Sequence, residues 1–144
     1  MAHPTHNLPI DSLLEMKAAS AVTTTTTHSS HDLGAAKYQR AALVVDITAC
    51  DATTGDELCV LQLQGATASG FSTAYQLATL RCGDLTQTGD AIDTQVGRYV
   101  LHFDNVVNVG SGETINVQHL RLRTVASGTS PSVTYQAWLS ISDA

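Results

Sequence analysis

Histidine pairs are the first candidates for chemistry in this sequence. His28 and His31 lie three residues apart in the segment His28-Ser-Ser-His31-Asp32. On an extended chain such residues point to opposite faces, so both rings could bind one metal ion only if the segment turns. His102 and His119 could likewise meet as metal ligands on a barrel wall. The plainer interpretations are that residues 28–32 form a polar turn and that His102 and His119 face outward among charged neighbours. We therefore expect no metal site.

An acidic turn and three cysteines offer two further possibilities. The carboxylates and carbonyls of Asp51–Asp56 could hold calcium, although the spacing differs from an EF-hand loop and suits a hairpin turn. Cys50, Cys59 and Cys82 are odd in number, are not spaced like zinc ligands and lie in or beside apolar runs. We therefore interpret the cysteines as small buried hydrophobic residues in a reducing compartment.

Motifs of the common catalytic classes are absent from the sequence. It contains no Gly-x-Ser-x-Gly elbow, no Walker loop and no His-Glu-x-x-His, and its glutamates, Glu15, Glu57 and Glu113, are scattered. We expect a protein that is not an enzyme and that carries no cofactor.

Composition indicates one folded domain whose partners are proteins. The chain has 144 residues, of which 43% are hydrophobic and 14% charged, and this is enough apolar material for a sizeable core. The net charge of −6 gives no general attraction to nucleic acid or to an anionic membrane. No apolar run reaches the roughly 18 residues of a membrane span, and residues 1–10 lack the pattern of a signal peptide.

The elements that must position any site are predicted to be strands, because apolar residues alternate with polar ones from residue 41 onward. Strands are expected at 43–49, 57–64, 75–80, 98–104, 117–125 and 133–141, with a weaker one at 85–92. Residues expected to point inward are Leu43, Val45, Ile47, Ala49, Cys59, Leu61, Leu63, Tyr99, Leu101, Phe103, Leu120, Leu122, Val133, Tyr135, Ala137, Leu139 and Ile141. The pattern predicts an all-β antiparallel sandwich or jelly roll of about seven or eight strands.

The N-terminal part carries the only helix signal. Residues 1–20 are expected to form an arm that docks on a partner, with Asp11 capping a short helix over 11–19. The β domain is expected to span residues 21–144. Its first strand is predicted over Ala21–Ser30, because a run of threonines has high β propensity, although its identical faces leave the register open.

Two outward features favour a binding surface. Trp138 falls on the face of its strand opposite Tyr135 and Leu139, so a simple sandwich would leave it partly in water, as at many interfaces. His119, Arg121 and Arg123 form a basic stripe in an acidic protein. This stripe is either a solvated or internally paired face or a contact with acidic residues of a neighbouring subunit.

Several segments resemble the small jelly-roll cement, or decoration, proteins of tailed-phage capsids. They are Ile10–Met16 followed by Ala-Val-Thr, His31–Gly34, Leu61–Leu80 (LQLQGATASGFSTAYQLATL) and Arg121–Ser140 (RLRTVASGTSPSVTYQAWLS). The resemblance implies a structural virion protein that binds the outer surface of the shell, commonly as trimers, and reinforces it against internal pressure. Assembly would take place in the host cytoplasm, with the major capsid protein as partner.

The residues expected at such an interface come from the arm, the threonine run, the basic stripe and the tryptophan. They are Ile10, Leu13, Leu14, Thr23, Thr25, Thr27, His119, Arg121, Arg123 and Trp138. The strongest rival is a carbohydrate- or receptor-binding jelly roll, as in a tail fibre or lectin-like module, which needs clustered aromatics; only 5% of this chain is aromatic. A cupin-like metal enzyme would need a convergent set of histidines and carboxylates.

Overall fold

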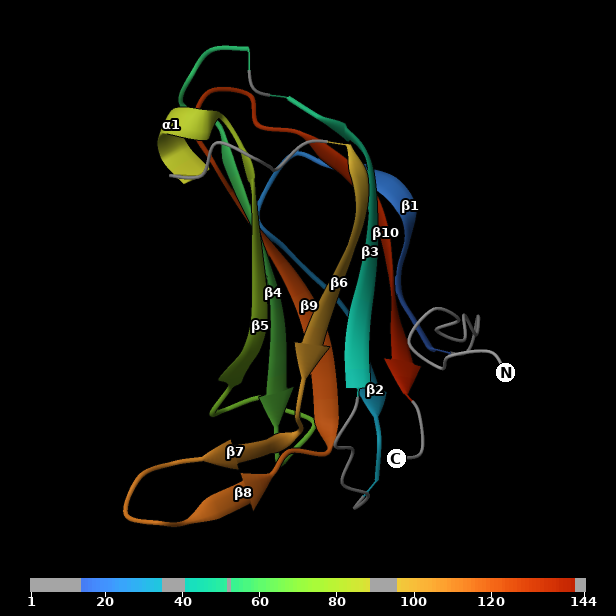
Figure 1. Ribbon diagram of the computed structural model, residues 1–144, viewed down its shortest axis with the longest axis vertical. Helices are drawn as coiled ribbons and strands as arrows, with labels where there is room; N and C mark the ends of the chain where they lie inside the picture. Colours follow the sequence, from blue (N-terminus) through green and yellow to red (C-terminus); the bar gives the residue numbers. More distant parts are fainter. Residues whose placement is uncertain (1–13, 35–40, 52, 89–95, 142–144) are drawn as a thin grey trace, which may run out of the picture.

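Two four-stranded antiparallel sheets face each other in the computed structural model, which describes residues 14–34, 41–51, 53–88 and 96–141 (Figure 1). Sheet A has the order β1 (Glu15–Val22), β10 (Val133–Ile141), β3 (Ala41–Cys50), β6 (Gly97–Phe103). Sheet B has the order β2 (Thr26–Asp32), β9 (His119–Ser127), β4 (Leu58–Ala66), β5 (Tyr75–Gly83). A small hairpin of β7 (Val106–Asn108) and β8 (Thr114–Asn116) and a short helix α1 (Leu85–Thr88) lie at opposite ends (Figure 1).

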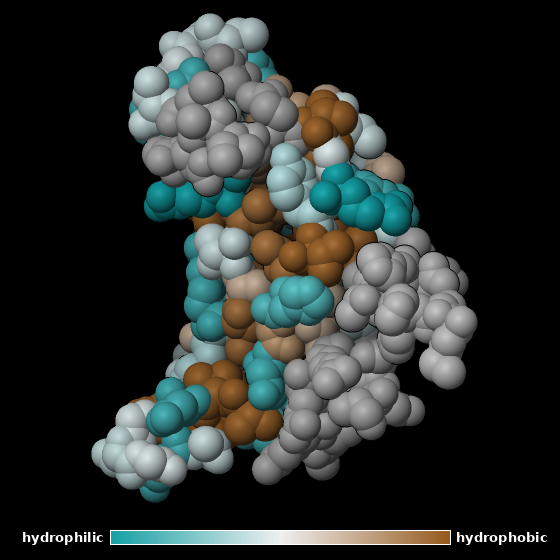
Figure 2. Space-filling view, in the orientation of Figure 1, coloured by the Kyte–Doolittle hydropathy of each residue, from teal (hydrophilic) through white to brown (hydrophobic). Residues whose placement is uncertain are grey.

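The core fills the space between the sheets and contains the side chains that alternation predicts to point inward, except Ala49; the side chain of Ile141 is outside what the structure describes. Leu43, Leu61, Leu122, Tyr135 and Leu139 are fully buried. Figure 2 shows apolar side chains between the two sheets along the β5–β6 side, bordered by hydrophilic ones. Within the described residues, no helix is long and apolar enough to cross a membrane.

Ala49 contradicts its predicted inward position because β3 contains a bulge. Ile47 pairs with Tyr135, and Ala49 pairs with Thr134, so Thr48 is an extra residue on β3. The extra residue reverses the alternation. Ala49 is therefore exposed, and Cys50 packs against the core.

The N-terminal prediction is wrong for the residues that can be compared. Glu15–Val22 forms strand β1, paired with β10, where a helix and arm are expected up to residue 20. The apolar residues of this short segment are spaced in a way that fits either a helix or an edge strand. The segment forms a strand because it can pair with the edge of β10. Residues 1–13, including Ile10 and Leu13, lie outside the described residues, and Leu14 packs against the core.

The threonine run is not a single strand. Ala21 and Val22 end β1, Thr23–Thr25 connect the two sheets, and Thr26 begins β2. His28–Asp32, expected to turn, is also part of β2. The weaker strand expected at 85–92 is wrong at its start, because Leu85–Thr88 is helical.

A buried polar network closes the β1–β2 side of the sandwich. The Lys17 ammonium group donates to the carbonyl oxygens of Ser20 (2.7 Å) and Tyr135 (2.8 Å) and lies 4.4 Å from the centroid of the Tyr135 ring. His28 Nε2 is 2.9 Å from Thr124 Oγ1, which is hydrogen-bonded to the Tyr135 hydroxyl. Burial, and then the nearby Lys17 charge, lower the pKa of His28. Neutral His28 is therefore favoured inside the protein.

Candidate interaction face on sheet B

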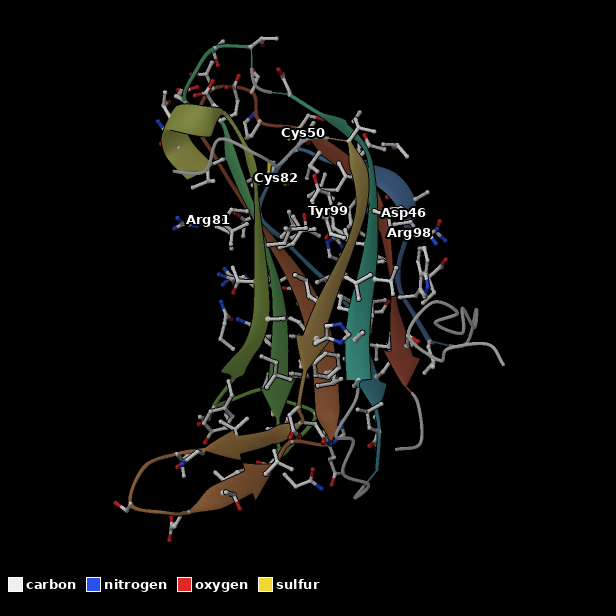
Figure 3. The ribbon with its side chains drawn as sticks, viewed as in Figure 1. Asp46, Cys50, Arg81, Cys82, Arg98 and Tyr99 are labelled. Carbon is white, nitrogen blue, oxygen red and sulfur yellow. The ribbon has the colours of Figure 1, made fainter. Side chains whose placement is uncertain are left out.

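Three arginines share the outer face of sheet B. Arg121 and Arg123 alternate along β9 with the buried Leu120 and Leu122, so they lie on the solvent side. Arg81 extends from β5, away from the sandwich (Figure 3). We call this surface the arginine face and define it by Arg81, Arg121, Arg123, Thr27, Ser30, Gln62, Gln64, Gln76 and Thr79.

The polar residues of the arginine face stand in rows across the strands. One row consists of Thr27, Arg123, Gln62 and Thr79. The next consists of Ser30, Arg121, Gln64 and Gln76. Because paired residues point to the same side of a sheet, Arg121 and Arg123 are flanked by hydroxyl or amide groups, whereas Arg81 pairs with Val60. The face can therefore offer many hydrogen bonds besides its positive charge.

Arg121 is fixed in place by two neighbours. Its Nε donates to Gln64 Oε1 at 2.9 Å, and its guanidinium carbon lies 4.4 Å from the centroid of the Phe71 ring. Phe71 belongs to the β4–β5 loop and has a φ of +51°, which turns the loop back so that its amide donates to Ala68 O. This loop holds one arginine in a defined position before any partner arrives.

The charges of the arginine face are not neutralised by carboxylates of sheet B. Within the part of the chain that the structure describes, the one ion pair joins Arg98 to Asp46, at 2.7 Å. That pair lies on sheet A, on the other side of the molecule from Arg81 (Figure 3). A protein of net charge −6 thus presents a local positive surface, which favours an acidic partner.

The predicted interface residues are distributed over several surfaces. Arg121, Arg123 and Thr27 belong to the arginine face, and His119 lies at its end, opposite Asp32. Thr23 and Thr25 are exposed in the connection between β1 and β2. The Thr25 hydroxyl oxygen accepts from the Ala126 amide at 3.1 Å, which holds that connection against β9.

Trp138 is buried, and the expectation that it is partly in water is wrong. Its side chain is 3% exposed, and the Arg98 guanidinium carbon lies 5.4 Å from its ring centroid. Arg98 is held in turn by its two hydrogen bonds to Asp46. The outward side of a strand need not face water, so alternation alone does not place this indole.

The two histidines of the first candidate pair have different hydrogen-bond partners, and those of the second pair lie on different sheets. A bulge in β2 between Thr27 and Ser30 lets both His28 and His31 face the interior, yet His31 Nε2 contacts Glu15 O, 2.8 Å away. His102 and His119 lie on different sheets. Among the described residues, no three His, Cys, Asp or Glu side chains are grouped to hold a metal ion.

The acidic turn is organised by hydrogen bonds from threonines. The Asp51 carboxylate accepts from Thr53, and Asp56 accepts from Thr54 and from the amide and hydroxyl of Thr129. Hydrogen bonds from Thr129 lower the pKa of Asp56. These interactions explain the turn as a structural connection between β3 and β4.

Arg81, Gln62, Gln64 and Phe71 were not among the predicted site residues. The alternation of Arg81 with Leu80 and Cys82 could have placed it on the outside, but only the strand order puts β5 in the same sheet as β9. No protein-family model matches the chain, and no curated protein matches it in sequence.

Proposed function

We propose that this protein is a capsid cement protein, which binds the outer surface of a tailed-phage shell and stabilises it. The arginine face carries the proposal, because it is a polar and positively charged surface whose arginines form no ion pair with a carboxylate among the described residues. Such a surface suits docking on an acidic protein surface. The resemblance of Leu61–Leu80 and Arg121–Ser140 to cement proteins supports the same function. Both segments contribute strands to sheet B.

We also infer that the sandwich is a jelly roll. Consecutive strands of the two main sheets alternate between them, except for the β4–β5 pair. The orders β1-β10-β3-β6 and β2-β9-β4-β5 are those obtained when one long hairpin is wrapped into two sheets, with the first and last strands paired. In this topology β9, β4 and β5 lie side by side in sheet B, which places Arg81 on the same face as Arg121 and Arg123.

The proposed partner is the major capsid protein, and the proposed assembly is a homotrimer on the virion surface that acts without catalysis, cofactor or nucleic acid. Three copies would present three arginine faces at once. Several modest contacts then give a high combined affinity, because the later contacts form at high effective concentration. Sedimentation equilibrium of the free protein tests the trimer; a single monomeric mass at micromolar concentration argues against it.

Co-sedimentation with empty capsids tests the proposed function. We expect the unaltered protein to pellet with shells and to raise their resistance to heat. The double variant Arg81→Gln/Arg123→Gln should bind at least about tenfold more weakly, because it removes two positive charges from the arginine face. Arg98→Gln is the matched control on sheet A and should bind normally. Equal binding by both variants would remove the arginine face from the proposal, and no binding by the unaltered protein would overturn the function.

A further inference from the structure

Three cysteines from separate strands converge inside one end of the sandwich. Cys59 on β4 and Cys82 on β5 are directly paired across the two strands and are 1% and 0% exposed. Cys50, at the end of β3 in the other sheet, is half-buried and packs against the same core. The bulge at Thr48 turns Cys50 inward. Figure 3 shows Cys50 and Cys82 between the sheets, near the end that carries α1.

The Cys82 thiol is the centre of this group. It donates a hydrogen bond to Cys59 O at 3.4 Å, and it also interacts with the thiols of both Cys50 and Cys59. Hydrogen bonding by Cys82 lowers the pKa of Cys50, whereas the pKa of Cys82 is raised by its interactions with Cys50 and Cys59 and by burial. The half-exposed Cys50 is thus the natural nucleophile, with a protonated thiol beside it.

We propose that Cys50 and Cys82 are a redox modification site at which a disulfide forms between sheets A and B. Cys50 is the member that a soluble oxidant can reach, and Cys82 is the thiol in contact with it from the opposite sheet. Cys59 shares its sheet with Cys82, so a Cys59–Cys82 bond would not connect the two layers. This inference does not depend on what the arginine face binds.

The chemistry is thiol–disulfide exchange with a small disulfide such as oxidised glutathione. The Cys50 thiolate attacks one sulfur, which forms a mixed disulfide and releases one glutathione thiolate. Cys82 then attacks the Cys50 sulfur and passes its proton to the leaving glutathione sulfur, so the second glutathione leaves as a thiol. Two protein thiols are oxidised, and one glutathione disulfide is reduced to two thiols.

Mass spectrometry of the native full-length protein, incubated with oxidised glutathione, tests the proposal. We expect the loss of two hydrogens and a non-reduced peptide that joins Cys50 to Cys82. Free thiols should fall from the present three to one. The midpoint of thermal unfolding should rise by roughly 5–10 °C and return after reduction with dithiothreitol, because the cross-link restricts the unfolded chain.

Cysteine variants identify the partner. Cys59→Ser should still form the cross-link, whereas Cys82→Ser should stop at a glutathione adduct on Cys50. A Cys59–Cys82 peptide in the unaltered protein, a lasting glutathione adduct without a cross-link, or no change in mass would each overturn the proposal. Even if a variant folds poorly, the peptide map of the unaltered protein identifies which two cysteines are joined.

Discussion

Lys17, His28, Thr124 and Tyr135 show how much a few polar residues contribute inside an otherwise apolar core. Lys17 is 6% exposed, and its ammonium group donates to oxygen acceptors from β1 and β10. The Tyr135 hydroxyl is hydrogen-bonded to Thr124 across the two sheets. A buried polar group is tolerated when its hydrogen bonds are made and is costly when one partner is removed. Removing one of these hydrogen-bonding groups should therefore lower the stability of the folded protein.

Tyr135→Phe tests the contact between the sheets. The substitution removes the hydroxyl and leaves Thr124 Oγ1 with one partner fewer in a buried position. We expect a loss of about 1–2 kcal/mol in the free energy of unfolding, measured by urea denaturation. Tyr75→Phe, at a half-buried site, is the control and should change little. An unchanged stability of Tyr135→Phe would contradict the role given to this hydroxyl.

His28 predicts a pH dependence of stability. The pKa of His28 in the folded protein lies below the unfolded value of about 6.5. As the pH decreases, this histidine is therefore protonated in the unfolded chain before it is protonated in the folded chain. The free energy of unfolding should therefore fall as the pH decreases below about 6.5. Urea denaturation at pH 7.5 and 5.5 measures the change. His28→Gln should make it smaller, whereas His102→Gln, at an exposed position, should not; an equal change in all three proteins would contradict the prediction.

At the scale of elements, two loops pack so closely that only glycine fits between them. Gly128, in the β9–β10 loop, has a φ of +97°, and a Cβ there would collide with the carbonyl oxygen of Asp56. Asp56 also binds Thr129, so the β3–β4 and β9–β10 loops form one unit. This contact brings together segments about seventy residues apart in sequence.

Gly128→Ala should destabilise the protein more than Gly110→Ala. Gly110 in the β7–β8 hairpin has a similar φ of +93°, but a Cβ added there would meet nothing within 4 Å, so it isolates the conformational cost. We expect about 1 kcal/mol for Gly110→Ala and about 3 kcal/mol or more for Gly128→Ala. Urea denaturation of the two variants measures the difference. Equal losses would mean that the loop contact relaxes without cost.

For the whole molecule, the separation of charges predicts how binding should respond to salt. The arginine face is positive, the chain as a whole is negative, and both are exposed to mobile ions. Capsid binding through this face should weaken at least severalfold between about 50 and 300 mM sodium chloride, because salt screens the attraction. Co-sedimentation across this range measures it. Salt-independent binding would indicate an apolar interface elsewhere on the molecule.

The strands and their inward residues could be predicted from sequence because alternation is a local property. Leu61 and Leu63 on β4 and Leu120 and Leu122 on β9 are buried as their pattern requires. Gln62 and Arg121 lie on the opposite face for the same reason. The same alternation predicts that Arg121 and Arg123 share one side of a strand.

Local pattern did not predict where this alternation reverses or which strands become neighbours, because both depend on contacts in the folded protein. Bulges in β2 and β3 turn His31 and Cys50 inward, and the sheet order brings Arg81 beside the rows of Arg121 and Arg123. It also makes Glu15–Val22 a strand and buries Trp138. Each of these features depends on contacts between segments that are distant in sequence, and no local pattern specifies which segments meet.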